Sequence, residues 1–595
     1  MIPPAAASAR PPHGHDLSEP PATIRDVESI WRLVPPDPAV SAALARELGI
    51  SELMAHLISR RGAATPADAR LFLSPDGEAL HDPSRLRGAV EAAELLVSAA
   101  LHGRRIVVFG DYDVDGVTAV AQLRASLRRI GADVVAFIPH RLREGYGLKP
   151  DTVRRVLREH APSVLITVDC GINAVEGVAC ARAAGVDVIV TDHHLVPEAL
   201  PAGAIVVNPR QPGCSYPYKE LAASAIALKI AEAVARRAGV ALSRDSLLRA
   251  ACLGTIADLV PLTGENRVIA ACGLAALADA RAPGLRALLA ESGLAAGQRP
   301  SAEQVAFRIA PRLNAAGRID TAALALSLLE ERDGDRARAL AGELSARNAE
   351  RQALERRVVA EARARLEGDP EARGAAVIVD ADPGWHRGVL GIAASRLARE
   401  YHRPVLLFGV DGDRASGSGR SIPGVSLHGI LKNLGEHFLD FGGHDQAVGA
   451  TMPASRFPQF RAEARALFRE SIPAECLIPT EEAEAEVALD MIGPELGDEL
   501  ARLEPHGAGN PRPLFLARGV ESDGESIPLG EHGRRGRLRR SRGDGVRFVA
   551  WRPTETVERL ASGSGAFDIL YRLPTDRPEF SPRLEIVAAR PAGSG

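Results

Sequence analysis

Acidic and imidazole side chains are grouped in four short segments of this chain. In sequence order they are Asp111, Asp113 and Asp115; Asp169; Asp192, His193 and His194; and Asp258. Carboxylates crowded together repel one another, and burial increases the repulsion, so such a group requires cations. Oxygen ligands with one or two imidazoles suit Mn²⁺ or Mg²⁺ better than a structural Zn²⁺. Two such ions would activate a water molecule and neutralise a phosphate, which predicts phosphodiester hydrolysis.

Alternating apolar runs must bring these segments together. Strands rich in β-branched residues are expected at 106–111, 134–139, 164–169, 186–192 and 204–209, with helices at 117–130, 150–160 and 175–184. Continuous apolar strands separated by helices are typical of a buried parallel sheet, and right-handed crossovers then give a doubly wound α/β domain. Ligands of such a domain bind outside the carboxyl ends of the strands, where at least three of the four segments lie.

Other interpretations of the polar residues were weighed. The Asp-x-Asp-x-Asp-Gly run resembles the start of a calcium-binding EF-hand loop, but Gln122 stands at the twelfth position, where Glu is required, and a strand precedes it. Solvated turn aspartates would explain Asp111 alone but not the whole set. A His-His pair is usually surface or core decoration, but here it directly follows a strand-terminal aspartate, which favours a function.

Composition limits the class of protein. A chain of 595 residues exceeds one hydrophobic core, so several domains are expected. The net charge of -4 means that any nucleic acid must be bound by local basic patches. Six cysteines without a Cys-x-x-Cys pair argue against structural zinc and fit a reducing compartment. Without an apolar run long enough for a bilayer or a signal peptide, we expect a cytoplasmic protein and no membrane partner.

Four motifs resemble those of the DHH phosphoesterase family when they are taken in order: GDYDVDG (110–116), VDCGI (168–172), TDHH (191–194) and GTIADLVPL (254–262). Each is weak alone, and their order and spacing make them specific. From about residue 30 onward, further segments are similar to the branch of the family that degrades single-stranded DNA. They include HRLREGYGL (140–148), RIAPRLNAAGR (308–318), NAERQ (348–352), WHRGVLGIAASRL (385–397), SGSGRS (416–421), GGHDQAVG (442–449) and PHGAGNPRPLF (505–515).

The resemblance implies an α/β architecture of several parts. The expected order is a disordered tail (1–25), a helical segment (26–95), a doubly wound DHH domain (96–330), a connecting long helix (331–368), a smaller α/β DHHA1 domain (369–470) and a C-terminal OB-fold β-barrel (476–595). Leucines at near-helical spacing among many Arg and Glu residues independently favour the connecting helix. Short β runs after about residue 475 favour the barrel.

The resemblance also implies roles for individual residues. The implied metal ligands are Asp113, Asp115, Asp169, His193 and Asp258, with Asp169 bridging two ions. The implied catalytic residues are Asp111, His194 and Arg318. For Asp111, the resemblance leaves two roles open, that of a ligand and that of a group behind the ligands. The implied substrate contacts are Arg141, Tyr146, Arg312, Asn314, His386, Ser418, Arg420 and His444.

Structural roles are the alternatives for several of these residues. Arg141 and Tyr146 would also fit an ordinary loop. Arg312, Asn314 and Arg318 would also fit a salt bridge on a helix surface. Ser418 and Arg420 are expected on a Gly-rich turn, where small residues let the backbone approach an anion. The resemblance implies that this anion is the 5′-phosphate. A packed glycine turn and a satisfied core histidine are the alternatives for His444 and His386.

Arginines alternate along the expected C-terminal strands and could line a groove for single-stranded DNA. They are Arg534, Arg535, Arg537, Arg539, Arg540, Arg542, Arg547 and Arg552. A merely solvated barrel face is the alternative. One departure from the family pattern follows the fifth strand, where Ala223-Ser224-Ala225 replaces Gly-x-Gly before Lys229, which puts close backbone packing there in doubt.

The expected activity is metal-dependent, 5′ to 3′ exonucleolytic hydrolysis of single-stranded DNA to 5′-mononucleotides, in DNA repair and recombination. A single-strand-binding protein and a helicase are the implied partners. One alternative is a DHH/DHHA1 phosphodiesterase acting on short oligonucleotides or cyclic dinucleotides, which typically lacks the OB-fold. The other is a catalytically dead DNA-binding scaffold, which should have lost metal ligands.

Overall fold

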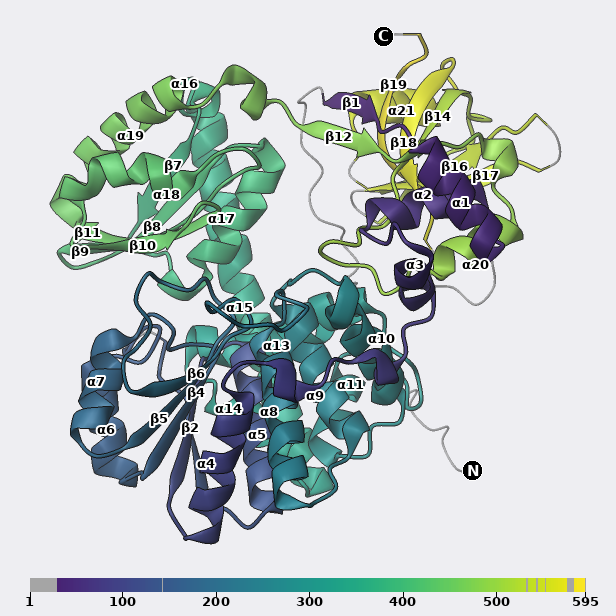
Figure 1. The fold of residues 1–595 in the computed structure, drawn as a ribbon. Coiled ribbons are helices and arrows are strands. Elements are labelled where there is room, and N and C mark those ends of the chain that lie inside the picture. Colours follow the sequence, from purple (N-terminus) through teal and green to yellow (C-terminus); the bar gives the residue numbers. More distant parts are fainter. Residues whose placement is uncertain are drawn as a thin grey trace, which may run out of the picture.

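The structure, a computed structural model, describes residues 29–141, 143–530, 533–541, 544–551, 553–574 and 583–593. The tail expected at 1–25 lies outside these residues. Figure 1 shows a large α/β body, a second α/β body in green beyond it, and a third body in yellow that the purple N-terminal elements join. One long helix, α15 (Gly334–Gly368), runs between the first two bodies.

The first body contains a five-stranded parallel sheet in the order β3-β2-β4-β5-β6. Its strands are β2 (Ile106–Gly110), β3 (Val134–Phe137), β4 (Val164–Val168), β5 (Asp187–Thr191) and β6 (Ala204–Val207). Side chains alternate between its two faces. Ile106 and Val108 of β2 join one core cluster, and Val107 and Phe109 join another. Helices cover both faces, as predicted for a doubly wound sheet.

The helices of this body divide between the two clusters. On one face lie α4 (Ala89–Leu101), α5 (Val114–Arg129) and α8 (Ala223–Ala238), and on the other lie α6 (Pro150–His160) and α7 (Val175–Ala183). The chain then forms α9 (Arg244–Ala257), α10 (Gly264–Ala278), α11 (Pro283–Glu291), α12 (Ala302–Gln304), a π-helical turn (Val305–Ile309), α13 (Ala310–Ile319) and α14 (Ala323–Glu330). The mostly helical 221–330 region agrees with the sequence pattern.

The strand order creates a switch point. From β2 the chain leads to β3 on one side, whereas β4 lies on the other side of β2. In open α/β sheets the ligand crevice lies outside the carboxyl ends of the strands at such a point. Asp111 directly follows β2, and Asp169 directly follows β4. The sheet therefore brings the first two acidic segments together.

Helix α15 belongs to two hydrophobic cores. Ala341 and Leu344 pack into the first body, whereas Val358 and Leu366 pack against α17 (Arg387–Tyr401) of the second body. A charged helix with apolar residues at helical spacing thus connects two domains, as the sequence predicted. Because the helix is continuous over 35 residues, it fixes the distance between the two cores.

The second body is a mixed five-stranded sheet in the order β10-β11-β9-β8-β7. Its elements are α16 (Pro370–Gly374), β7 (Ile378–Asp382), β8 (Val405–Asp411), β9 (Arg414–Arg420), α18 (Leu427–Leu431), β10 (Asp440–His444), β11 (Ala447–Pro453) and α19 (Phe457–Ser471). The prediction of a Gly-rich turn at Ser418 and Arg420 is wrong, because both lie on β9. A Cβ at Gly417 would lie 2.4 Å from the Phe408 ring, so glycine there lets the side chain of the neighbouring strand pack over β9.

The third body combines the two ends of the described chain. Its seven-stranded sheet has the order β13-β14-β18-β19-β17-β16-β15. The strands are β13 (Ala485–Glu486), β14 (Phe515–Val520), β15 (Ile527–Leu529), β16 (Gly533–Leu538), β17 (Val546–Trp551), β18 (Phe567–Arg572) and β19 (Arg583–Pro591), and the helices are α20 (Pro494–Ala501) and α21 (Glu555–Ala561).

The N-terminal segment packs onto this sheet. Its helices α1 (Pro38–Leu48), α2 (Glu52–Arg60) and α3 (Pro66–Leu73) share the core of the sheet through residues such as Leu57 and Phe72. Short helices were predicted here, but β1 (Ile30–Leu33) is a strand that pairs in parallel with β12 (Thr480–Ala483). Its pattern is too short to identify from the sequence, because its partner lies about 450 residues away.

Within the described part of the chain, no single helix has the length and apolar character to cross a membrane. Only α10 and α11 taken together meet these two criteria, and they are bent by 93° relative to each other.

Candidate active site

Two hydrogen bonds fix the end of the loop after β2, where α5 begins. Asp113 caps the N-terminus of α5, and its Oδ1 accepts a hydrogen bond from Gly116 N at 3.0 Å. Asn314 on α13 accepts the hydrogen bond of Val114 N through its Oδ1 at 3.1 Å. Asn314 therefore holds the acidic loop in place, and the substrate contact that the resemblance implied for it stays a prediction.

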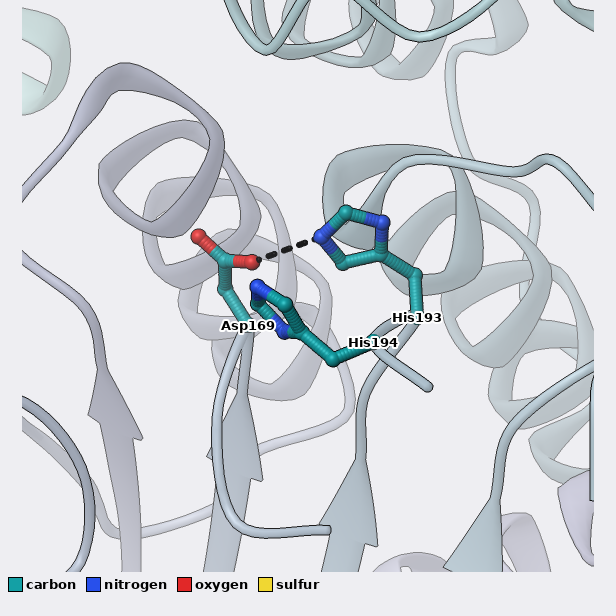
Figure 2. A group of neighbouring side chains, drawn as sticks. All are labelled: Asp169, His193 and His194. Carbon is teal, nitrogen blue, oxygen red and sulfur yellow. Dashed lines mark ion pairs between the residues drawn. The ribbon is translucent and has the colours of Figure 1, made fainter. Parts of the chain in front are cut away.

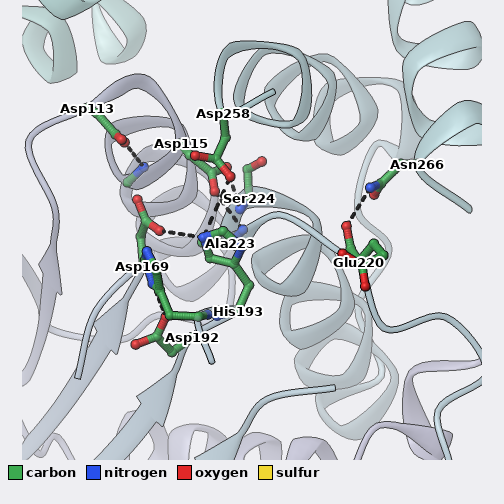
Figure 3. A network of polar contacts seen from close by, with 12 residues as sticks. Asp113, Asp115, Asp169, Asp192, His193, Glu220, Ala223, Ser224, Asp258 and Asn266 are labelled. Atoms are coloured by element: carbon green, nitrogen blue, oxygen red, sulfur yellow. Dashed lines mark hydrogen bonds and ion pairs between the residues drawn. The ribbon is translucent and has the colours of Figure 1, made fainter. Parts of the chain in front are cut away.

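Asp115 is buried and is held by the N-terminus of α8. Its Oδ2 accepts the hydrogen bond of Ala223 N at 2.7 Å, and its Oδ1 accepts that of Ser224 N at 2.9 Å (Figure 3). Backbone packing here is close even without the Gly-x-Gly sequence, because Gly254 of α9 faces Ser224 and Asp115. A Cβ at Gly254 would lie 2.2 Å from Ser224 Oγ and 2.3 Å from Asp115 Oδ1. The glycine needed for close approach is supplied by the facing helix.

Three further segments meet at this point. His193 Nε2 lies 3.2 Å from Asp169 Oδ1 and 3.7 Å from Asp258 Oδ2 (Figures 2 and 3). Asp169 has a φ of 62°, a left-handed conformation that is unusual outside glycine and is found at sites where a side chain must be aimed. Asp258 is the C-cap of α9.

His194 is oriented by Asp192. The Nδ1 atom of His194 lies 2.7 Å from Asp192 Oδ1, and Tyr146 Oη lies 3.3 Å from the same nitrogen. Asp192 also accepts the hydrogen bonds of Ile172 N, His193 N and His194 N, so its carboxylate is fully used within the protein. Sequence reasoning assigned no separate role to Asp192, although its position before the histidine pair was a signal. Its bonds leave Nε2 of His194 available to a ligand.

The donor atoms fit divalent cations. Three sets each place one donor atom per residue within 4.8 Å of the others: Asp111, Asp113 and Asp169; Asp115, His193 and Asp258; and Asp169, His193 and His194. Within the described residues, the buried atoms Asp111 Oδ1 and His193 Nε2 have no hydrogen-bond partner. Buried polar atoms without a partner are costly, and a cation would satisfy both.

Ionisation supports the same conclusion. Burial, with the nearby charge of Asp115, raises the pKa of Asp258 to about 8, and burial, with Asp113, raises the pKa of Asp115 to about 6. Burial, with Asp113, also raises the pKa of Asp169. Burial lowers the pKa of His193 to about 4, so its imidazole is neutral at pH 7, the form that binds metals. Excess negative charge with a neutral imidazole is the electrostatic pattern that a metal ion relieves.

Three arginines face one another beside the carboxylates. Burial and the charge of Arg141 lower the pKa of Arg318 and of Arg420, so the three guanidinium groups lie close enough to repel. Arg141 and Arg318 come from the first body and Arg420 from the second. Gly391 on α17 makes room for the guanidinium of Arg420, because a Cβ there would lie 2.9 Å from Nη2. Such a cluster would be stabilised by an anion such as a phosphate.

Of the remaining predicted substrate contacts, some lie at the site and others do not. Tyr146 donates a hydrogen bond to Asp169 O at 3.1 Å and so lies at the site. Arg312 is not brought to it, because its Nε donates to Ser345 Oγ on α15 and its Nη1 to Arg308 O. His386 caps α17, with Nδ1 accepting the hydrogen bond of Gly388 N. His444 is exposed on the outer strand β10.

The arginines of the third body are partly used within it. Arg534 pairs with Glu558, and Arg539 pairs with Glu521. On β16, Arg535 and Arg537 face the partner strand at Val549 and Arg547. Arg542 and Arg552 lie outside the described residues. At least two of the eight arginines that the sequence suggested for a single-strand groove, Arg534 and Arg539, are therefore engaged in ion pairs within this body.

Three family models match the chain. They are the DHH family N-terminal domain over residues 105–255, the DHHA1 domain over 374–470 and the RecJ OB domain over 483–584. They confirm the predicted fold class, with its parallel-sheet domain, smaller α/β domain and C-terminal OB domain.

Related proteins carry one description. The single-stranded-DNA-specific exonuclease RecJ of Dickeya dadantii is 35% identical over 485 residues, covering 78% of this chain and 83% of that protein. RecJ of Bacillus subtilis is 38% identical over 82% of this chain, and RecJ of Thermus thermophilus is 40% identical over 78% of it. The matched region spans less than two thirds of these two relatives, 61% and 66% of their lengths. Among solved structures, Thermus thermophilus RecJ in complex with Mn²⁺ has a TM-score of 0.80 at 34% identity, covering 95% of this chain and 80% of that one.

Proposed function

We propose, from the premise that this chain belongs to the RecJ family of DHH phosphoesterases, that it is a metal-dependent exonuclease of single-stranded DNA. It degrades the strand from 5′ to 3′ and releases 5′-mononucleotides. The observation that carries this proposal is the meeting of five carboxylates and two imidazoles from four segments, where the buried atoms Asp111 Oδ1 and His193 Nε2 have no hydrogen-bond partner among the described residues.

Two Mn²⁺ or Mg²⁺ ions would be held by this set. Asp113, Asp115, Asp169, His193 and Asp258 would hold the ions. Asp169, the residue that the resemblance implies is shared by both ions, belongs to two of the three donor sets, as His193 does. Asp111 joins the set that contains Asp113 and Asp169. Bound ions of this kind supply an activated water and neutralise charge on the phosphate.

The protein's own side chains hold the substrate. Arg141 and Arg318 neutralise the phosphate oxygens, since guanidinium groups bind phosphate through paired hydrogen bonds. Burial opposes a charge on His194, but the hydrogen bond and negative charge of Asp192 outweigh it and raise its pKa to about 9. His194 therefore carries a proton at Nε2 that it can donate to a phosphate oxygen.

The 5′ polarity is assigned to the second body. Ser418 and Arg420 on β9 would bind the terminal 5′-phosphate, across from the carboxylates of the first body. This arrangement agrees with the mutual repulsion of Arg420 and Arg141, which an anion between them would relieve. Phosphate contacts carry no base code, so sequence preference should be low.

A nuclease assay on single strands labelled at the 5′ or the 3′ end tests this function. With Mn²⁺, we expect the 5′ label to be released first as a mononucleotide, and Asp169→Ala to abolish release. Asp151→Ala, an exposed carboxylate on α6, is the matched control and should retain activity. First release of the 3′ label would overturn the polarity, and hydrolysis of a dinucleotide in preference to a long strand would favour the short-oligonucleotide alternative.

We also propose that the enzyme acts in the cytoplasm, in DNA repair and recombination, with a helicase and a single-strand-binding protein. A nuclease restricted to single strands needs another activity to separate a duplex. A blunt duplex should therefore be degraded only when a helicase and ATP are added. Equal degradation of the duplex without helicase would contradict this proposal.

A further inference from the structure

Leu259 stands next to the metal-ligand candidate Asp258 in a conformation that leucine rarely adopts. Its φ is 61°, in the left-handed region. It is the residue after the C-cap of α9, a position that glycine usually occupies because a Cβ is unfavourable there. Helices α1 and α8 of this chain do end on left-handed glycines, Gly49 and Gly239. Leucine at the end of α9 therefore carries a conformational cost that α1 and α8 avoid, and that Ala161 and His402 also carry at the ends of α6 and α17.

The fold gains little from this side chain. Leu259 is 67% exposed, so its apolar surface is not used in any core. Single exposed leucines are common on protein surfaces, but they do not usually combine with a strained backbone. The combination places an apolar group, at a cost, beside a site of charged groups.

The surrounding loop holds Leu259 firmly. Pro261 O accepts hydrogen bonds from Tyr218 Oη at 3.2 Å and from Asn266 Nδ2 at 3.1 Å. Leu262 N donates to Ala508 O at 2.7 Å. On the other side, Asp258 N donates to Gly254 O at 2.9 Å within α9. With both flanks fixed, the left-handed backbone conformation at Leu259 persists.

We propose that Leu259 is a substrate-positioning residue that makes an apolar contact with the nucleoside next to the phosphate held at the metal site. The inference rests on the proposed function, because the ligand is a nucleotide of the bound strand. Consecutive Cα atoms are about 3.8 Å apart, so Leu259 lies within one nucleotide's length of the Asp258 carboxylate. The apolar parts of a nucleotide are its deoxyribose and the faces of its base. A leucine has no hydrogen-bonding group, so the contact adds affinity without reading the base.

Leu259→Gly separates this role from a structural one. The variant removes the side chain and relieves the strained backbone, so the melting temperature should rise by roughly 2 °C while Mn²⁺ binding, measured by calorimetry, stays unchanged. The KM for a 5′-phosphorylated single strand should rise about ten-fold with kcat unchanged, the signature of a lost uniform contact. Strands of dA and dT should respond equally.

Ala161→Gly is the matched control. Ala161 ends α6 with a φ of 44°, so its substitution by glycine relieves the same kind of strain away from the carboxylates. It should raise the melting temperature and leave KM unchanged. A strand with abasic residues at its 5′ end distinguishes the two possible contacts. If the base is touched, Leu259→Gly should have little effect on the abasic strand, and if the sugar is touched, the ten-fold effect should remain.

The outcomes separate the two proposals. A wild-type protein that does not hydrolyse single-stranded DNA would contradict the proposed function, and this inference with it. An active wild type, together with a Leu259→Gly variant whose KM and kcat are unchanged on both strands, would overturn the inference alone. A fall in Mn²⁺ affinity in the variant would also overturn it, because Leu259 would then act by holding Asp258.

Discussion

Gly254→Ala tests whether the α8 N-terminus and the α9 helix together set the position of Asp115. The added Cβ would lie 2.2 Å from Ser224 Oγ, 2.6 Å from Ser224 Cβ and 2.3 Å from Asp115 Oδ1. All three atoms are buried, so either the two helices separate or the carboxylate moves by roughly 1 Å. Both responses disturb the hydrogen bonds that Ala223 N and Ser224 N donate to Asp115.

The size of the effect follows from these contacts. Overpacking of a well-packed interior costs about 1–3 kcal/mol. Weakening of hydrogen bonds to a charged group destabilises the fold by about 1.5–3 kcal/mol more. The higher helix propensity of alanine relative to glycine stabilises it by about 0.5–1 kcal/mol. The free energy of unfolding should therefore fall by about 2–5 kcal/mol. A shifted ligand should also weaken Mn²⁺ binding by about 10–100-fold, as loss of a supporting contact at a metal site does.

Urea denaturation and calorimetric titration with Mn²⁺ measure the two effects. Gly342→Ala on α15 is the matched control, because a Cβ there would meet no atom within 4 Å and should stabilise slightly. Ser224→Gly combined with Gly254→Ala removes the Ser224 contacts but not the contact with Asp115, so stability should recover more than Mn²⁺ affinity does. A Gly254→Ala protein with wild-type stability and Mn²⁺ affinity would refute the reasoning.

The remaining predictions concern the domain contacts and the charges of the site. Buried Arg267 donates hydrogen bonds to the carbonyls of Phe72 and of residues 502–505. Arg267→Met should therefore lower the free energy of unfolding by about 3–5 kcal/mol in urea denaturation, and an unchanged urea midpoint would contradict this. The raised pKa values of Asp258, about 8, and Asp115, about 6, mean that the folded metal-free protein keeps protons which the unfolded chain loses above about pH 4. Between about pH 4 and 6.5 the lowered pKa of His193 opposes this trend, so the melting temperature should fall most clearly as the pH rises from about 6.5 to about 8, and a flat profile would argue against the raised values. Saturating Mn²⁺ should remove that fall and raise the melting temperature at pH 8, and EDTA should restore it.

The first body could be predicted well because its strands, and the polar residues at their ends, are visible in short stretches of sequence. Continuous apolar strands such as 106–110 can only be buried, and the polar residues after them follow from the strand ends. The sequence could not predict contacts made by a partner far along the chain. Gly254 compensates for Ser224 from another helix, and Arg312 turns toward Ser345 instead of the site. The strand at Ser418 was mistaken for a turn because Gly-Ser-Gly is typical of turns unless a neighbour such as Phe408 needs the space.

The pairing of β1 with β12, and of α1–α3 with the C-terminal sheet, has a consequence for synthesis. Helices α1–α3 leave the ribosome with their apolar faces uncovered, because the strands that cover them are made later. At about 5–20 residues per second, roughly 400 intervening residues correspond to a delay of about 20–80 seconds. During that interval the nascent N-terminal helices are natural clients for a chaperone, and a chain that stops early leaves them exposed permanently.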